Sequence, residues 1–244
     1  MAMFLQFKDQ IKALPVDYTD DMLLNETFLL DKDQKKGLDI YYAPFEYVNQ
    51  RAKVIIVGIT PGFHQMKRSY STVINTTGTD EEILKKVKEE SSFHGSMRKN
   101  LVAMLDELKL ADYLEIATTE QLFNVYHHYL QSTSVLPHAV FYKGKNYNGA
   151  TPKISSNELL RKYVHTYFPK NIQGIEHALL IPLGVNVQAV VEELMRAGHI
   201  KSYPLLRGFP HPSGGNGHRL KQFTTNKEQM AEVIKRFFET AKYR

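Results

Sequence analysis

Stretches of this chain with continuous apolar residues, typical of buried strands, alternate with stretches in which apolar residues recur at helical spacing. Together they predict strands separated by helices. The apolar runs at 53–59 (KVIIVGI) and 176–183 (EHALLIPL) are typical of strands buried on both faces of a parallel sheet. Shorter strands are predicted at 203–207 and in the centre of 123–136, whose latter half, 131–134, is unusually polar. Polar side chains in a buried strand need hydrogen-bond partners, which are either internal or supplied by a ligand.

Helices are predicted where apolar residues recur at helical spacing or where a capping signal opens a polar stretch. The first helix has Phe4, Phe7, Ile11 and Leu14 on one face, and Thr79 opens a later one with a capping box. The predicted helices cover residues 1–14, 79–90, 96–110, 118–123, 155–167, 185–197 and 226–242, with irregular segments at 16–50 and 142–154. Strands that alternate with helices predict an α/β fold, here a three-layer α/β/α arrangement with a mostly parallel central sheet.

We expect one domain over residues 1–244. Its parts are an N-terminal helix and wrapping segment (1–52), a core (53–225) and a C-terminal helix (226–244). In the last helix Phe237, Phe238 and Tyr243 recur at helical spacing, so they are expected in the core.

Residues 208–219 (GFPHPSGGNGHR) form a loop with an unusual density of polar side chains. Four glycines and two prolines exclude a regular helix or strand and let the backbone approach a ligand closely. The side chains that can address a phosphate or a polar ring edge are His211, Ser213, Asn216, His218 and Arg219. A connecting loop seldom needs so many directional groups, so this loop is predicted to be part of a site.

A second loop, 58–63 (GITPGF), leaves the strand at 53–59. Ligands of open α/β sheets bind outside the carboxyl ends of the strands, so the two loops are expected to meet at one rim of the sheet and to line a pocket. Plain turn chemistry of Gly58, Pro61 and Gly62 is the alternative.

Composition and charge narrow the possible partners. The chain has no cysteine, which excludes disulfides and thiolate chemistry and fits a reducing cytosol. No apolar run approaches the length of a membrane span, and the N-terminus lacks the pattern of a secretory signal. Residues 201–244 hold nine Lys or Arg against three Glu, whereas the whole chain has a net charge of only +5. The positive excess therefore lies in and after the 208–219 loop, where a polyanion would be steered.

The two loops together resemble the motifs of the uracil-DNA glycosylase superfamily, and most closely those of its single-strand-selective monofunctional branch. There the first motif reads roughly G-M-N-P-G-P-F-G-M and the second H-P-S-P-x-N. Residues 58–63 match the first apart from the asparagine and the proline before the phenylalanine, and residues 211–216 keep the His, the Ser and the Asn of the second at the same spacing. Residues 146–152 resemble that branch's N-L-T-P-x-E-L stretch more loosely.

The resemblance implies an enzyme of base excision DNA repair that flips a uracil or related damaged base into a pocket and hydrolyses its N-glycosidic bond, with no metal or organic cofactor. It gives His211 the role of donor to the base carbonyl, and it gives Phe63 the role of stacking on the base. The other residues that it implies are Gly58, Ile59, Ser132 and Thr133 for the base and Ser213, Gly214, Asn216, His218 and Arg219 for the DNA backbone. The base-reading asparagine of the family has no clear match, and Gln131, Ser132 or Thr133 would fill that role. The expected partner is single- or double-stranded DNA, and the expected state is a monomer in a bacterial-type cytosol or nucleoid.

Thr60 is the largest departure from the family pattern, because the family has Asp or Asn at the position that places the attacking water. A threonine hydroxyl can hydrogen-bond water but is no base. A catalytically weak or inactive protein of the same fold that binds a base or nucleic acid is therefore the alternative. A small-molecule hydrolytic enzyme ranks last, because the chain lacks a G-x-S-x-G elbow and a phosphate-cradling GKS/T loop. His211 and His218 have no carboxylate nearby in the sequence, so no metal site is expected.

Overall fold

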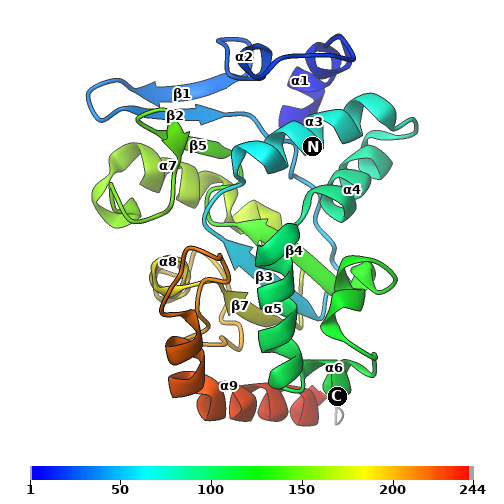
Figure 1. Cartoon of the computed structure of the whole chain (residues 1–244), viewed down its shortest axis with the longest axis vertical. Coiled ribbons are helices and arrows are strands. Elements are labelled where there is room, and N and C mark those ends of the chain that lie inside the picture. Colours follow the sequence, from blue (N-terminus) through cyan, green and yellow to red (C-terminus); the bar gives the residue numbers. More distant parts are fainter. Residues whose placement is uncertain (1, 242–244) are drawn as a thin grey trace. The chain divides into compact units, whose positions relative to one another are not determined.

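The apolar run after Lys53 forms β3 (Val54–Gly58), the central strand of a three-stranded sheet in the computed structural model, which describes residues 2–241. The sheet has the order β4-β3-β7, with β4 at Leu130–Ser134 and β7 at Leu179–Pro182 (Figure 1). β3 and β7 run parallel, in a register from Val54 opposite Leu179 to Val57 opposite Pro182. Every residue of both strands is buried, which confirms these two predicted strands and their burial on both faces.

The strand predicted at 203–207 is wrong in extent, because only Leu205 forms a bridge, parallel to Leu180. Leu180 donates to the Pro204 carbonyl and Leu206 donates to the Leu180 carbonyl, both at 2.9 Å. Pro204 has no N–H of its own and the chain turns at Gly208, which limits the ladder to this single bridge.

A second, antiparallel sheet was missed by the sequence analysis. It has the order β1-β2-β5-β6, and its strands are Leu29–Asp33, Leu38–Tyr41, Ala139–Tyr142 and Lys145–Asn146. The segments expected to be irregular at 16–50 and 142–154 therefore contain strands. These strands have two to five residues, too few for a period to be visible, and β2 finds its partner β5 about a hundred residues away. The α/β class is confirmed, but the parallel sheet accounts for only three of the strands.

The helices agree with the sequence pattern except at four places. The bounds are α1 (Ala2–Lys12), α2 (Asp20–Leu23), α3 (Phe63–Asn75), α4 (Asp80–Ser91), α5 (Gly95–Glu107), α6 (Leu110–Leu114), α7 (Glu158–Tyr167), α8 (Val185–Arg196) and α9 (Arg219–Ala241), with short 3-10 helices at Thr119–Phe123, His127–Tyr129, Ile154–Ser156 and Pro169–Ile172. The prediction missed α2, α3 and α6. It also placed the start of the last helix at 226, whereas α9 begins at Arg219; Phe223, in the added turns, is buried against Phe209. The predicted helix end at Lys242 and the core role of Tyr243 lie outside the described residues.

The chain divides into two compact units, each assembled from separate stretches of sequence. Unit 1 comprises 1–48, 59–92 and 134–171, and unit 2 comprises 49–58, 93–133 and 172–244. Among residues 2–241, no helix has the length and apolar character needed to cross a membrane.

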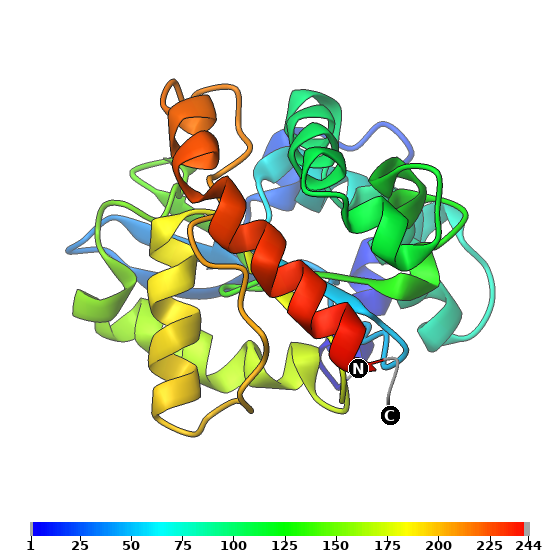
Figure 2. The same cartoon turned by 90° about the horizontal axis from the view of Figure 1, so that it is seen from below.

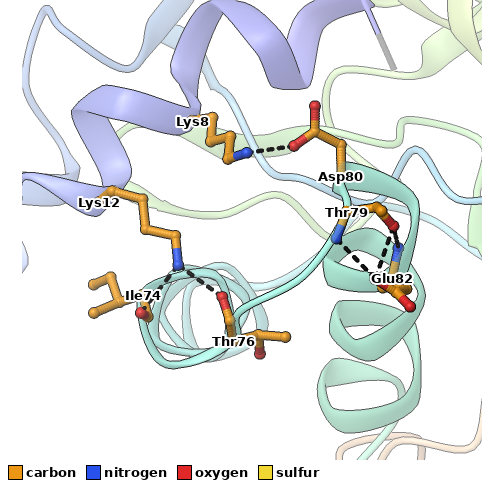
Figure 3. A network of polar contacts seen from close by, with 7 residues as sticks. All are labelled: Lys8, Lys12, Ile74, Thr76, Thr79, Asp80 and Glu82. Carbon is orange, nitrogen blue, oxygen red and sulfur yellow. Dashed lines mark hydrogen bonds and ion pairs between the residues drawn. The ribbon is translucent and has the colours of Figure 1, made fainter.

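Unit 1 carries a core of aromatic and aliphatic residues and a polar network that joins three of its helices. Lys8 of α1 pairs with Asp80 of α4 at 2.5 Å, and Lys12 donates to the carbonyls of Ile74 and Thr76 at the C-terminal end of α3 (Figure 3). Figure 3 also shows the capping box of α4, in which the Thr79 hydroxyl accepts from the Glu82 N–H and the Glu82 carboxylate accepts from the Thr79 N–H. The predicted capping box is thereby confirmed.

Unit 2 has its own core between the parallel sheet and the helices around it. The long helix α9, red in Figure 2, buries Phe223, Met230, Ile234 and Phe238 at helical spacing. Phe238 is therefore a core residue as predicted, whereas Phe237 is partly buried against the same cluster. α5 contributes Leu101 and Leu105, both fully buried, to this core.

A buried histidine in unit 1 gives the fold a predictable sensitivity to acid. His138 precedes β5, lies among the rings of Tyr42, Tyr163 and Tyr167, and accepts a hydrogen bond from the Ala43 N–H at Nδ1. Burial lowers its pKa from the ordinary 6.5 to about 4. The unfolded chain therefore takes up this proton near pH 6.5, whereas the folded protein takes it up only near pH 4.

We expect this part of the stability to be complete above about pH 6.5 and to be lost as the pH falls toward 4, by on the order of 3 kcal/mol. Urea unfolding at pH 7 and pH 4.5 measures the loss. The variant His138→Gln can still accept from Ala43 but does not titrate, so it should lose less free energy of unfolding between the two pH values. An equal loss in both proteins contradicts the prediction.

Candidate functional site

The loop 208–219 lies at the carboxyl edge of the parallel sheet of unit 2. β7 ends at Pro182, after which the Leu183 N–H donates to the Val57 carbonyl of β3 and the Gly184 N–H donates to the Phe209 carbonyl at 3.0 Å. β3 ends at Gly58 on the same edge, since the two strands are parallel. Carboxyl edges of parallel strands are where α/β proteins bind ligands.

His211 is the central side chain of this loop, and a neighbouring N–H defines which tautomer its ring adopts. Its Nδ1 accepts a hydrogen bond from the Ser213 N–H at 3.3 Å. A backbone N–H can only donate, so the neutral ring carries its proton on Nε2. Burial lowers the pKa of His211 below the ordinary 6.5 and keeps the ring neutral at pH 7. The site thus presents a neutral imidazole that donates from Nε2.

Gly184 brings the backbone close to His211, and both its conformation and this close contact disfavour any other residue at this position. It has a φ of +92°, and a Cβ added there would lie 3.2 Å from the His211 Cβ. The variant Gly184→Ala should therefore displace His211 and strain the backbone, with an expected loss of about 1–3 kcal/mol in the free energy of unfolding. Thermal unfolding measures this loss, and Gly198→Ala provides a control with a similar positive φ (+71°) and open space around the added Cβ. Equal losses in the two variants would show that the contact with His211 contributes nothing.

The residues assigned to the DNA backbone divide into two groups. Gly214 and His218 are exposed, which leaves their polar groups accessible to a phosphate. Asn216 is used inside the loop, where its Nδ2 donates to the His211 carbonyl and to Gln222 Oε1 and its Oδ1 accepts from the His218 N–H. Arg219 likewise donates to the Ser213 carbonyl at 2.9 Å, and Ser213 itself is half-buried. Asn216 and Arg219 therefore shape the loop directly.

The polar half of β4 contains one buried hydroxyl group that has no hydrogen-bond partner. Gln131 Oε1 accepts from the Asn49 N–H at 3.0 Å, so this side chain holds the segment before β3. Ser132 and Thr133 are both buried. Among the described residues, Thr133 Oγ1 is one of four buried side-chain atoms with no hydrogen-bond partner. Of the three candidates for reading a base, Thr133 has an unused hydroxyl in a buried position.

In unit 1, the first motif continues from Gly58 and is held by its own hydrogen bonds. The Thr60 hydroxyl donates to the His138 carbonyl at 2.7 Å and accepts from the Val140 N–H at 3.1 Å. Its single proton is therefore already used. Ile59 packs against Gly149, where an added Cβ would lie only 2.9 Å from the Ile59 side chain.

Phe63 is the first residue of α3, and its surroundings fix the start of that helix. The Phe63 N–H donates to Asn146 Oδ1 at 2.9 Å, and the Gly62 N–H donates to the Gln65 side chain at 3.2 Å. The Phe63 ring is half-buried and packs edge-on to Phe141, with the ring centroids 6.2 Å apart. Residues 146–152, which resemble the family only loosely, therefore contribute a cap to the first motif.

Three residues that hold one or the other of the two motifs in place were missed in the sequence analysis. Asn146 caps the first motif, Gly184 packs on His211, and Asn100 of α5 donates to the Pro212 carbonyl at 2.9 Å. Gly184 could have been found, because it follows a buried strand directly. Asn100 carries no sequence signal, since it lies in an ordinary amphipathic helix 112 residues before its partner. Within residues 2–241, no three His, Asp or Glu side chains are placed to hold a metal ion.

No model of a known protein family matches the chain, and no solved structure matches it. The chain is similar to the uncharacterized protein YoxB of Bacillus subtilis (strain 168), with 40% identity over 237 residues. The aligned region covers 95% of this chain and 92% of YoxB.

Proposed function

We propose that this chain, which belongs to the same family as YoxB, is a DNA glycosylase-like protein that takes a uracil or related damaged base flipped out of DNA and hydrolyses its N-glycosidic bond. The observation that carries the proposal is the neutral His211, whose Nδ1 is occupied by Ser213 and whose Nε2–H is left as a donor at the carboxyl edge of a parallel sheet. The three-layer arrangement of the uracil-DNA glycosylase superfamily is part of the proposal.

The chemistry of base release explains why such a donor is useful. Breaking the N-glycosidic bond builds negative charge on the departing base, and a fixed donor at its carbonyl oxygen stabilises that charge. A neutral imidazole with its proton on Nε2 supplies this hydrogen bond without first gaining a proton. The resemblance gives Phe63 the role of stacking on the base, which is worth roughly 1–3 kcal/mol. It also gives the exposed Gly214 and His218 contacts with the DNA backbone.

Thr60 favours a second candidate function, in which the protein binds a base or nucleic acid and cleaves slowly or not at all. The Thr60 proton is used by the His138 carbonyl, and the oxygen already accepts from Val140. A hydroxyl in this state has one remaining lone pair for water and cannot act as a base. Under this candidate function the protein binds DNA with a strong dependence on salt and without turnover.

Incubation with oligonucleotides that contain one uracil, in single and double strands, followed by alkali to cut abasic sites, tests the enzymatic proposal directly. Strand cutting that depends on the protein supports it. The absence of cutting with uracil and with a panel of other deaminated and oxidised bases rejects it. A filter-binding series from 50 to 200 mM salt on the same oligonucleotides then tests the binding function.

The variant Thr60→Asn separates the two candidates. An asparagine can still accept from Val140 and offers an amide to hold water, so we expect glycosylase activity to rise at least about tenfold. The alkali assay on the single-stranded uracil substrate measures the change. Thr60→Val, which has a similar shape and no hydroxyl, is the control and should not gain activity. A wild-type protein that is already fast, with no gain in Thr60→Asn, would remove the case for a weakened enzyme.

A further inference from the structure

Three consecutive carbonyl groups in the second motif each accept a hydrogen bond from a side chain. Asn216 Nδ2 donates to the His211 carbonyl at 3.1 Å, Asn100 Nδ2 donates to the Pro212 carbonyl at 2.9 Å, and Arg219 donates to the Ser213 carbonyl at 2.9 Å. Asn216 and Arg219 belong to the loop or its immediate end. Asn100 is the only one of the three that comes from a distant part of unit 2.

Asn100 is held in place by the helix that carries it. Its neighbours on α5, Leu101 and Leu105, are fully buried in the core of unit 2, which fixes the rotation of the helix. Arg98, two residues closer to the start of α5, donates to the Phe93 carbonyl at 2.6 Å and lies over the Phe123 ring. The Asn100 amide therefore approaches Pro212 from a rigid element.

The hydrogen bond from Asn100 acts on the same peptide unit that contacts the His211 ring. The Pro212 carbonyl and the Ser213 N–H belong to one planar peptide group and point in opposite directions. Asn100 holds the carbonyl end, and the N–H end donates to His211 Nδ1 at 3.3 Å. A hydrogen bond accepted by the carbonyl also polarises the group and makes its N–H a better donor. The chain of contacts runs from Asn100 through one peptide plane to the imidazole.

We infer that Asn100 is a positioning residue for His211. By fixing the 212–213 peptide group, Asn100 keeps the proton of the neutral imidazole on Nε2. Without Asn100 this peptide can rotate, the Ser213 N–H leaves Nδ1, and the ring is free to take the other tautomer or turn about its χ angles. The inference on the tautomer stands on the contacts alone. Its consequence for catalysis rests on the proposed function.

Nitrogen-15 NMR of the His211 imidazole at pH 8, where the ring is neutral, tests the inference without any substrate. The test variants are Asn100→Asp, which has the same shape but cannot donate from its carboxylate, and Asn100→Leu, which has no polar atoms. We expect wild type to show a proton on Nε2 and both variants to show a mixture of the two neutral tautomers. Lys99→Ala changes an exposed neighbour on the same helix and should leave the His211 signals unchanged.

If glycosylase activity is present, we expect kcat to fall about 3- to 10-fold in both Asn100 variants, with KM changed less than twofold, as for the loss of one hydrogen bond. His211 signals that are identical in wild type and in two folded Asn100 variants would overturn the inference, even if the wild-type protein is an active glycosylase. A tautomer shift in a protein that cleaves no substrate would support the inference and reject the proposed enzymatic function. The two ideas are therefore tested separately.

Discussion

Under the proposed glycosylase function, the variant His211→Ala should release a uracil base about a hundredfold to a thousandfold more slowly than wild type, because it removes the proposed donor to the departing base. The structure gives the reason for expecting so large an effect from one side chain. His211 is neutral and its Nδ1 is occupied by Ser213, so the ring carries its proton on Nε2, where the proposal places the substrate carbonyl. Single-turnover cleavage of a single-stranded uracil oligonucleotide measures the rate.

His177→Ala is the matched control for this prediction, because His177 is an exposed histidine in the same unit. It should retain the wild-type rate. Circular dichroism and thermal unfolding of both variants check that the fold is intact. A His211→Ala protein that is folded and cleaves within threefold of wild type would remove His211 from the chemistry.

The variant Ile56→Ala should lower the free energy of unfolding by about 2–5 kcal/mol, the largest effect on stability that we expect from a single substitution here. Ile56 is fully buried in the central strand β3, opposite Ile181 of β7, and belongs to the core of unit 2. Alanine leaves a cavity where both faces of the strand are covered, so the surroundings cannot collapse fully onto it. Urea unfolding followed by circular dichroism measures the change.

A graded series makes this prediction sharper. Ile56→Val removes one methylene group and should cost about 0.5–1.5 kcal/mol. Val185→Ala changes a residue that is 71% exposed and should stay within about 0.5 kcal/mol of wild type. Equal effects of Ile56→Ala and Val185→Ala would contradict the burial of β3.

The strands could be predicted from the sequence where they are completely buried. The prediction failed where the strands are short. The runs that became β3 and β7 are apolar at nearly every position, because both of their faces are covered. The antiparallel sheet gives no such signal. Its strand β1 contains Asp31, Lys32 and Asp33 and is stabilised by pairing with β2, a partner that local sequence does not reveal. The isolated bridge at Leu205 shows the converse case, in which an apolar run does not build a full strand.

The loop around His211 could be predicted from its glycine, proline and polar residues, but the hydrogen bonds inside the loop could not. Sequence indicates that Asn216 and Arg219 are polar and near His211. It does not show that both donate to loop carbonyls, which depends on the path of the backbone. Thr60 was expected at the water-placing position, and its bonds to His138 and Val140 depend on β5, a strand that the sequence analysis did not predict. Long-range partners of this kind require the tertiary structure.

The most direct test of the central claim is nitrogen-15 NMR of the His211 imidazole at pH 7, with and without a single-stranded oligonucleotide that contains one uracil. We predict a neutral ring that carries its proton on Nε2, and a change in the Nε2 signal on addition of the uracil oligonucleotide that a matched thymine oligonucleotide does not produce. A proton on Nδ1, or an Nε2 signal that does not respond to the uracil oligonucleotide, would contradict the assignment of His211 as the donor to the base.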